Sequence, residues 1–314
     1  MRNSYEQMFL KLREAGSASD FPILLGDSLH RILLASMEAV PSTWQQWCNI
    51  QRNINDFREN HRIKISETDE LLEVKPGQPA QESTFDESEV TYVIKKFERV
   101  FGIPWEYLVN DDTGAIQQRP QAMGRAAGIT LAKFAVALLE AISASATITT
   151  ALSETTLASA VTEFKTRTDS HTGNKLAIIP KFLVVGSKNE NTARRILNSN
   201  QLISVGGGTT IAVQGNYNVS SAEATQLQLC VEPFMADDDD WFLAADPSVT
   251  PGVEIGFYRG QEQPRTFLKS SGIQGNDNPF DGGDFDTGSI TYKVRHIFGG
   301  AVVDPNGLLK VHVA

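Results

Sequence analysis

Apolar residues recur at helical spacing along the first sixty residues. One stripe follows the i, i+3, i+4, i+8 pattern and predicts a helix over 27–37, with the inward residues Leu29, Ile32, Leu33 and Met37. Two further short helices are expected over 5–15 and 43–54. These stripes need a surface to pack on, and the segment by itself offers no core.

Between residues 62 and 100 the pattern changes to the two-residue period of strands. The strand-like runs are RIKIS, LLEV and VTYVIKKFERV, and a Pro-Gly-x-Pro break predicts a long two-stranded hairpin. Four lysines against nine carboxylates give residues 63–98 a net charge of −5. An isolated ribbon buries little surface, so the hairpin is expected to fold back on its own domain or to lie across a neighbouring subunit. A solvated charged face is the plainer alternative.

The clearest helical pattern begins near residue 119. Pro120 fits a first turn, and six apolar residues at steps of three or four predict a helix over 119–143: Met123, Ala127, Leu131, Phe134, Leu138 and Ile142. A second helix is expected after Ser153, which is a suitable N-cap, with a buried face of Leu157, Ala160, Val161 and Phe164.

After residue 178 short strands alternate with helical signals. A buried strand over 178–185 is expected to precede a helix capped by Asn189 or Asn191, and three glycines at 206–208 predict a loop. Further strands are expected over 226–232, 241–244, 253–258, 289–297 and 308–313. A mixed sheet with these helices places the chain in the α+β class.

Composition narrows the classes of protein. The chain has 314 residues, enough for one large or two modest domains. Its net charge of −10 argues against a protein that binds nucleic acid by neutralising many phosphates. Cys48 and Cys230 lack CxxC spacing, which favours a reducing, intracellular setting. Charged residues within the first fifteen positions argue against an export signal. The longest apolar region, 126–152, contains charged and hydroxyl side chains and is expected to be too polar for a membrane span. The chain is therefore predicted to be soluble.

Motifs for catalysis are missing from the sequence. Five histidines occur without HExxH or HxH spacing: His30, His61, His171, His296 and His312. There is no GxSxG elbow, no phosphate loop and no GxGxxG, and GSKNENTARR after residue 185 is expected to be an ordinary capped helix. The sequence therefore predicts no catalytic, cofactor-binding or metal-binding residues, no cofactor and no enzymatic activity.

Two acidic loops keep other possibilities open. Asp237 to Asp240 and the segment 276–288 could offer carboxylates to calcium, since Asp284, Asp286 and Gly288 match part of an EF-hand loop. The flanking helix pair and the bidentate glutamate are missing, so solvated loops are expected. An enzyme using carboxylates at 237–240 and from Asp281 to Asp286 is retained as the least favoured hypothesis.

The order of the elements carries a family resemblance. The residues that carry it are LLEVKPGQPAQESTF, YVIKKFERVFGIPWEYLVNDD, RPQAMGRAAGITLAKFAVALL, VEIGFYRGQEQPR and FDTGSITYKVRHIFGGAVVDPNGLLKV. From about residue 21 to 313 the chain resembles major capsid proteins of tailed bacteriophages with the Hong Kong 97-type fold, and its closing region looks like that of Mu-like major head subunits. The resemblance implies five segments: an N-terminal arm over 1–60, an extended E-loop over 61–100, a peripheral domain over 101–177 with a spine helix over 119–143, an axial domain over 178–285 with later segments shared with the peripheral domain, and closing strands over 286–314.

The same resemblance implies a function. It is that of a major capsid protein that self-assembles as pentamers and hexamers into an icosahedral shell around phage double-stranded DNA, within the cytoplasm of a bacterial host. Scaffold, maturation protease and portal are expected partners, cement proteins are optional, DNA is a weak non-specific neighbour, and no membrane is involved. A decoration or head-completion protein of the same particle is the alternative.

Two properties of the family bear on covalent processing. One member crosslinks itself through a lysine and an asparagine. Four lysines of the hairpin region are candidates without a secure match to that motif, so noncovalent stabilisation is expected: Lys64, Lys75, Lys95 and Lys96. Members often lose an N-terminal scaffolding segment, so we expect either a separate scaffold or a chain that has already been processed.

Overall fold

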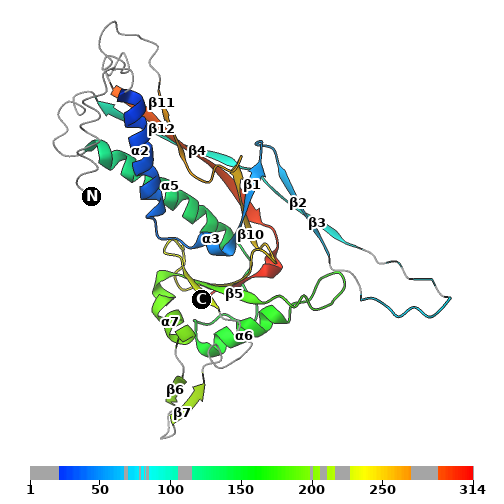
Figure 1. The fold of residues 1–314 in the computed structure, drawn as a ribbon. Coiled ribbons are helices and arrows are strands. Elements are labelled where there is room, and N and C mark those ends of the chain that lie inside the picture. Colours follow the sequence, from blue (N-terminus) through cyan, green and yellow to red (C-terminus); the bar gives the residue numbers. More distant parts are fainter. Residues whose placement is uncertain are drawn as a thin grey trace, which may run out of the picture. The chain divides into compact units, whose positions relative to one another are not determined.

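The computed structural model describes residues 21–66, 70–77, 79–80, 82, 85–104, 115–198, 201–205, 211–215, 227–269 and 289–313. Two compact units divide the chain: Met1–Val40, Lys95–Leu131 and Gln261–Phe298 form the first, and Pro41–Ile94, Ala132–Gly260 and Gly299–Ala314 form the second. Helices and strands are mixed throughout, so the predicted α+β class is confirmed (Figure 1). The helix expected over 5–15 and the loops at 206–208 and 276–288 lie outside the described residues.

The first unit contains an antiparallel sheet with helices on one face. β4 (Lys95–Pro104) and β11 (Arg265–Leu268) both pair with β12 (Ser289–Val302), whose residues up to Phe298 belong to this unit. α2 (Phe21–Glu38) and the first half of α5 (Ala115–Glu140) cover the sheet. Their apolar stripes form one core with alternate residues of β4 and β12: Leu29, Leu33, Leu34, Met123, Phe101, Ile103, Tyr292 and Val294.

The core of the second unit is a four-stranded sheet in the order β13-β9-β5-β8. Its strands are β5 (Pro180–Val185), β8 (Gln228–Val231), β9 (Trp241–Ala245) and β13 (Leu308–Val311), and only the β5–β8 pair is parallel. Two helices pack apolar side chains on this sheet, α6 (Glu154–Lys165) and α7 (Glu190–Asn198). Every residue of β9 is buried, which explains why its sequence is a continuous apolar run.

Three further strand pairings lie in the second unit, and the first of them is the outer part of a longer strand order, β1-β10-β12-β11. β1 (Cys48–Ile54) follows the short helix α3 (Trp44–Trp47) and pairs parallel with β10 (Val253–Tyr258). β2 (Asn60–Ile65) and β3 (Glu87–Tyr92) form an antiparallel pair, which we call the ribbon. β6 (Gln201–Val205) pairs with β7 (Ile211–Gly215), and two short 3₁₀ turns lie at Ser187–Asn189 and Pro305–Gly307.

Two predictions for the N-terminal third are wrong. The helix expected over 43–54 ends at Trp47 and continues as β1, because pairing with β10 outweighs the helical spacing of the apolar residues. The hairpin is shorter than expected: residues 71–75 form no strand, and VTYVIKKFERV is split between β3 and β4. β4 pairs with β12 over ten residues and therefore leaves the ribbon.

The helical predictions after residue 115 are closer. α5 runs over Ala115–Glu140 instead of 119–143, and Pro120 lies inside it, beyond the first turn. The Ser153 cap is confirmed: its Oγ accepts from the Thr156 backbone N at 3.2 Å, and Thr156 Oγ1 accepts from the Ser153 N at 2.8 Å. The predicted buried face of α6 is confirmed as well. β6, β7 and β11 were not predicted.

One described helix, over Gln118–Glu140, is long and apolar enough to cross a membrane by length and composition. This helix overlaps the first part of the region 126–152, which was expected to be too polar for a span. The evidence for a span is weak, because the core helix of a folded domain passes the same test. Leu131, Val136 and Leu139 of this helix are in fact buried inside the protein.

Candidate functional site

The ribbon has two unlike faces. On one face Ile63 and Ile65 are 66% and 58% exposed, and the residues paired with them, Glu89 and Glu87, are exposed too. The residues that alternate with them in β2, Arg62 and Lys64, point the other way and bond carboxylates of the same unit. The ribbon therefore presents one apolar and acidic face that nothing in the described part of its own chain covers.

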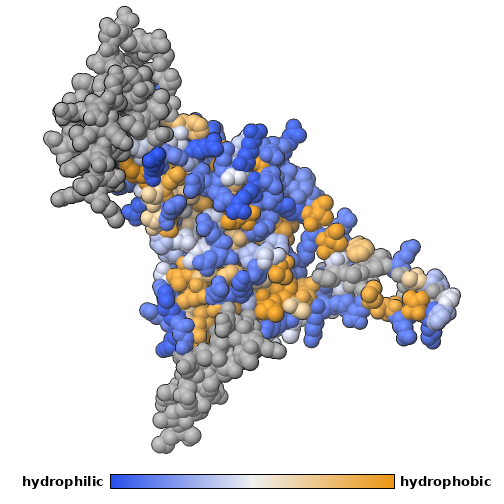
Figure 2. All heavy atoms as spheres, in the orientation of Figure 1, coloured by the Kyte–Doolittle hydropathy of each residue, from blue (hydrophilic) through white to orange (hydrophobic). Residues whose placement is uncertain are grey.

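The segment that joins the two strands of the ribbon is also uncovered. Every residue described between 70 and 89 is exposed. Four of these are large apolar side chains: Leu71, Leu72, Val74 and Phe85. Figure 2 shows hydrophobic side chains along this extended segment. Contiguous exposed apolar groups on a folded protein mark interaction surfaces, so the ribbon and its tip are the strongest candidate for a functional site.

A buried carboxylate holds the base of the ribbon. Glu254 of β10 is 3% exposed, and its Oε1 accepts from Arg62 Nε and Tyr92 Oη, each at 2.6 Å. Its Oε2 accepts from Asn49 Nδ2 at 3.0 Å. Burial and the hydrogen bond to Glu254 raise the pKa of Tyr92, which keeps the phenol protonated as a donor. The same carboxylate raises the pKa of Arg62 against the opposing effect of burial.

The four lysines considered for crosslinking lie in different surroundings. Lys64 Nζ contacts Asp304 Oδ1 at 2.7 Å, a second attachment of the ribbon, and Lys96 Nζ lies 3.4 Å from Glu98 Oε2. Lys75 and Lys95 are exposed. Whether any of them forms a covalent bond stays a prediction.

Another buried carboxylate fixes the segment that precedes β1. Glu232 is fully buried, and its oxygens accept from Ser42 Oγ at 2.9 Å and from both the N and Oγ1 of Thr43 at 2.6 Å. Trp47 Nε1 lies 3.4 Å from Oε1. All four donors are neutral, so hydrogen bonding alone compensates the loss of solvation at this site.

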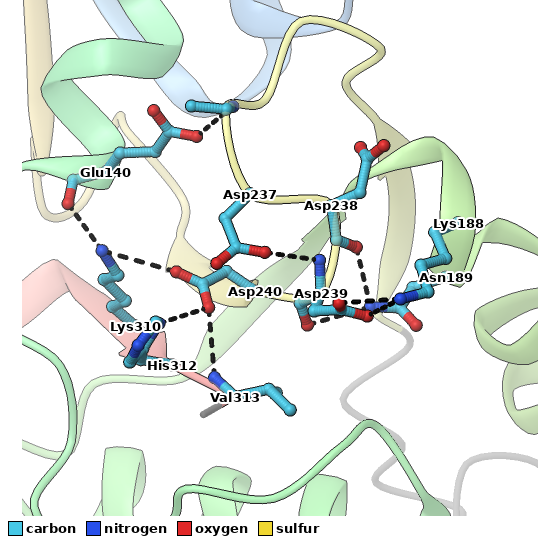
Figure 3. Close-up of polar contacts among 11 residues, drawn as sticks. Glu140, Lys188, Asn189, Asp237, Asp238, Asp239, Asp240, Lys310, His312 and Val313 are labelled. Atoms are coloured by element: carbon cyan, nitrogen blue, oxygen red, sulfur yellow. Dashed lines mark hydrogen bonds and ion pairs between the residues drawn. The ribbon is translucent and has the colours of Figure 1, made fainter.

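The acidic loop at 237–240 is tied into the second unit, as Figure 3 shows. Asp240 is 2% exposed, and its Oδ1 accepts from the Val313 backbone N and contacts His312 Nδ1. Asp237, Asp240 and His312 bring ligand atoms within 4.8 Å of one another, but the Lys310 ammonium lies 3.5 Å from Asp240 and already supplies a positive charge. The second predicted acidic cluster, 276–288, lies outside the described residues.

The two cysteines and the segment GSKNENTARR take part in packing and in hydrogen bonds within the protein. Burial raises the pKa of the Cys230 thiol to about 12 and that of Cys48 well above its usual value, so both are poor nucleophiles. In GSKNENTARR, Lys188 pairs with Asp239, and the Asn189 amide donates to the backbone oxygens of Asp238 and Asp239 instead of capping α7.

Sequence reasoning missed the two buried glutamates. Glu254 interrupts the apolar run VEIGFY, and Glu232 follows the strand QLCV directly. A single carboxylate inside or next to a buried strand signals a hydrogen-bonded or paired group, because an unpaired charge there is costly. The partners of these carboxylates, 162 to 205 residues away along the chain, could not be read from the sequence.

Comparisons with known proteins agree with this architecture. The family model described as "Phage capsid protein" matches residues 87–311, well over half of the chain. A capsid structure from cyanophage P-SCSP1u is similar at 13% identity and a TM-score of 0.55, covering 88% of this chain and 90% of that one. A structure from Mycobacterium phage Che8 is similar at 12% identity and a TM-score of 0.52, covering 86% and 90%. No curated protein matches the chain.

Proposed function

The chain belongs to the phage capsid protein family, and on that premise we propose how it builds a shell. It is a major capsid protein with an α+β capsid fold and a place in the virion. We infer that copies associate as pentamers and hexamers of an icosahedral shell, with the ribbon and the N-terminal arm lying across neighbouring copies. The observation that carries this proposal is the exposed apolar and acidic face of the ribbon and its tip.

The five segments implied by the sequence are kept within this proposal. We assign the ribbon and its tip to the E-loop over 61–100, α5 to the spine helix of the peripheral domain, and β5, β8 and β9 to the axial domain over 178–285; β13, in the same sheet, falls in the closing strands. The arm over 1–60 and the closing strands over 286–314 stay part of the same proposal. The Mu-like subgroup stays a prediction.

The first unit offers a surface that suits the ribbon of another copy. The face of the β4–β12–β11 sheet away from α2 carries four cations around Glu98, a net charge of +3: Lys96, Arg265, Lys293 and Arg295. The Arg295 guanidinium lies 4.1 Å from the centroid of the Phe267 ring, and Val100 on the same face is 59% exposed. Opposite charges and exposed apolar groups on both surfaces favour their association.

The proposal extends to the partners of assembly. Scaffold, maturation protease and portal are proposed as assembly partners in the host cytoplasm, and DNA as a weak non-specific neighbour. We propose no catalytic role for the chain. A decoration or head-completion protein would differ in copy number, so counting this chain per virion separates the two functions.

Electron microscopy and sedimentation of the expressed protein test the proposal. Rings, tubes or shells are expected, with scaffold if one is needed, and a strictly monomeric protein under every condition would contradict the function. Glu70→Lys with Glu73→Lys should abolish assembly, as should Lys293→Glu with Arg295→Glu, and mixing the two variants should restore mixed particles. Exchanging Glu190, which is half-buried, and Arg194, which is exposed, on α7 is the control and should leave assembly unchanged.

A further inference from the structure

The ribbon is attached to its unit through three polar side chains, and one of them, Tyr92, also has a buried ring. Along β2, the outward residues Ile63 and Ile65 contribute nothing to its attachment, because they are exposed. The inward residue Arg62 donates a hydrogen bond to Glu254, and Lys64 donates one to Asp304. Tyr92 of β3 also donates to Glu254. The direction of the ribbon therefore depends on a few directional bonds, since a two-stranded ribbon has little stability of its own.

Glu254 joins more elements than any other contact at this base. Its two oxygens bond β1 through Asn49, β2 through Arg62 and β3 through Tyr92, at 2.6 to 3.0 Å. Asp304, by contrast, bonds only one ribbon residue, Lys64, and its own side chain is 13% exposed against 4% for that of Glu254. Hydrogen bonds to a buried charged group are among the stronger ones in proteins, so Glu254 dominates the attachment.

The backbone next to Glu254 is shaped to receive Tyr92. Gly256 lies two residues further along β10, on the same face as Glu254. A Cβ at this glycine would stand 2.8 Å from Tyr92 Oη and would collide with the Ile54 side chain. The absence of a side chain therefore leaves the space in which the Tyr92 ring reaches the Glu254 carboxylate.

We propose that Glu254 is a positioning residue: one buried carboxylate sets the direction in which both strands of the ribbon leave the second unit. Its loss releases the ribbon while the β13-β9-β5-β8 core stays folded, because Glu254 contributes no side chain to that core. The consequence for assembly rests on the proposed function. A ribbon without a fixed direction meets its neighbour more slowly and in more than one geometry, so particles form in lower yield and with irregular closure.

Hydrogen exchange of the full-length, unassembled Glu254→Gln protein tests the positioning role directly. Amides of 60–65 and 87–92 are expected to exchange at least tenfold faster than in the wild type, while those of 180–185 and 241–245 keep wild-type rates. Glu190→Gln, which removes the ion pair with Arg194 on α7, elsewhere in the second unit, is the matched control and should leave ribbon exchange unchanged. Tyr92→Phe, which removes a single donor, should give an intermediate acceleration and serves if Glu254→Gln does not fold.

Two outcomes would overturn the positioning role. One is wild-type protection of the ribbon in both variants, and the other is equal acceleration in the ribbon and in the β5–β9 core. Assembly is measured separately by light scattering. If the ribbon loosens as expected but the wild type forms no particles, the positioning role stands and the proposed function fails. If the wild type assembles and the Glu254→Gln ribbon stays protected, the proposed function stands and the positioning role fails.

Discussion

β9 and β2 are short strands of the same unit that are stabilised in opposite ways. β9 lies inside the four-stranded sheet, and all of its side chains, from Trp241 to Ala245, are buried. β2 alternates exposed and half-buried residues and pairs only with β3 among the described strands. Burial of apolar surface holds β9, whereas the ribbon is held by the polar contacts of Arg62, Lys64 and Tyr92 and by the buried ring of Tyr92. The difference shows that one unit combines a sheet fixed by packing with an appendage whose direction is set by a few bonds.

Truncating a β9 side chain should give the largest effect. Phe242 is fully buried, and Phe242→Ala is expected to lower the free energy of unfolding by about 3–5 kcal/mol through lost apolar burial and the cavity left behind. Urea unfolding followed by tryptophan fluorescence measures the change. A loss below about 1 kcal/mol would mean that the packing of β9 is not what stabilises this sheet.

A buried histidine in the first unit extends the comparison to titratable groups. His296 of β12 is 4% exposed, and burial lowers its pKa to about 4, against about 6.5 in an unfolded chain. Between these values the unfolded state binds the proton and the folded state does not. Stability from this group is therefore complete above pH ~6.5 and falls by about 3 kcal/mol as the pH drops to about 4.

Unfolding midpoints measured from pH 7 to pH 4.5 check this dependence. Subtracting the profile of His296→Gln removes the contribution of the carboxylates that titrate in the same range. The wild-type protein should lose more stability on acidification than the variant. Identical slopes in the two proteins would contradict the assignment.

A substitution on the exposed face of the ribbon should give the smallest effect on folding. Ile63→Ser is expected to change the free energy of unfolding by less than about 0.5 kcal/mol, because the side chain is 66% exposed. The same change should reduce the yield of assembled particles seen by electron microscopy, since it removes apolar surface from the proposed contact. Normal assembly of this variant would shift the contact away from Ile63, and Leu71→Ser would then test the tip.

Local signals in the sequence predicted much of the fold. The Ser153 cap and the stripe that follows it specify α6 through neighbouring residues, and the apolar run at β9 specifies a strand buried on both faces. The prediction of a helix over 43–54 was wrong because the apolar spacing around Trp44 and Trp47 suits a helix. The following residues form a strand because they pair with β10, which lies some 200 residues away along the chain. The split between β3 and β4 has the same cause, since β12 recruits β4 from far along the chain.

The candidate site was predicted in outline only. The acidic and apolar character of residues 63–98 follows from their composition, so the expectation of a surface that meets neighbours could be formed from the sequence. Its attachment could not, because Glu254 lies 192 residues from Arg62 and 162 residues from Tyr92 along the chain. Long-range bonds of single side chains leave no periodic trace in a sequence.

The hydrogen bonds to Glu232 attach the segment before β1 in a way that should not depend on ionic strength. Ser42, Thr43 and Trp47 approach that carboxylate with neutral groups inside the protein, where dissolved ions have little access. Lys64 and Asp304 form a partly solvated pair of opposite charges, which added salt weakens. Raising the salt concentration should therefore weaken the attachment of the ribbon through Lys64 and Asp304. The hydrogen bonds that hold the start of β1 on Glu232 should keep their strength.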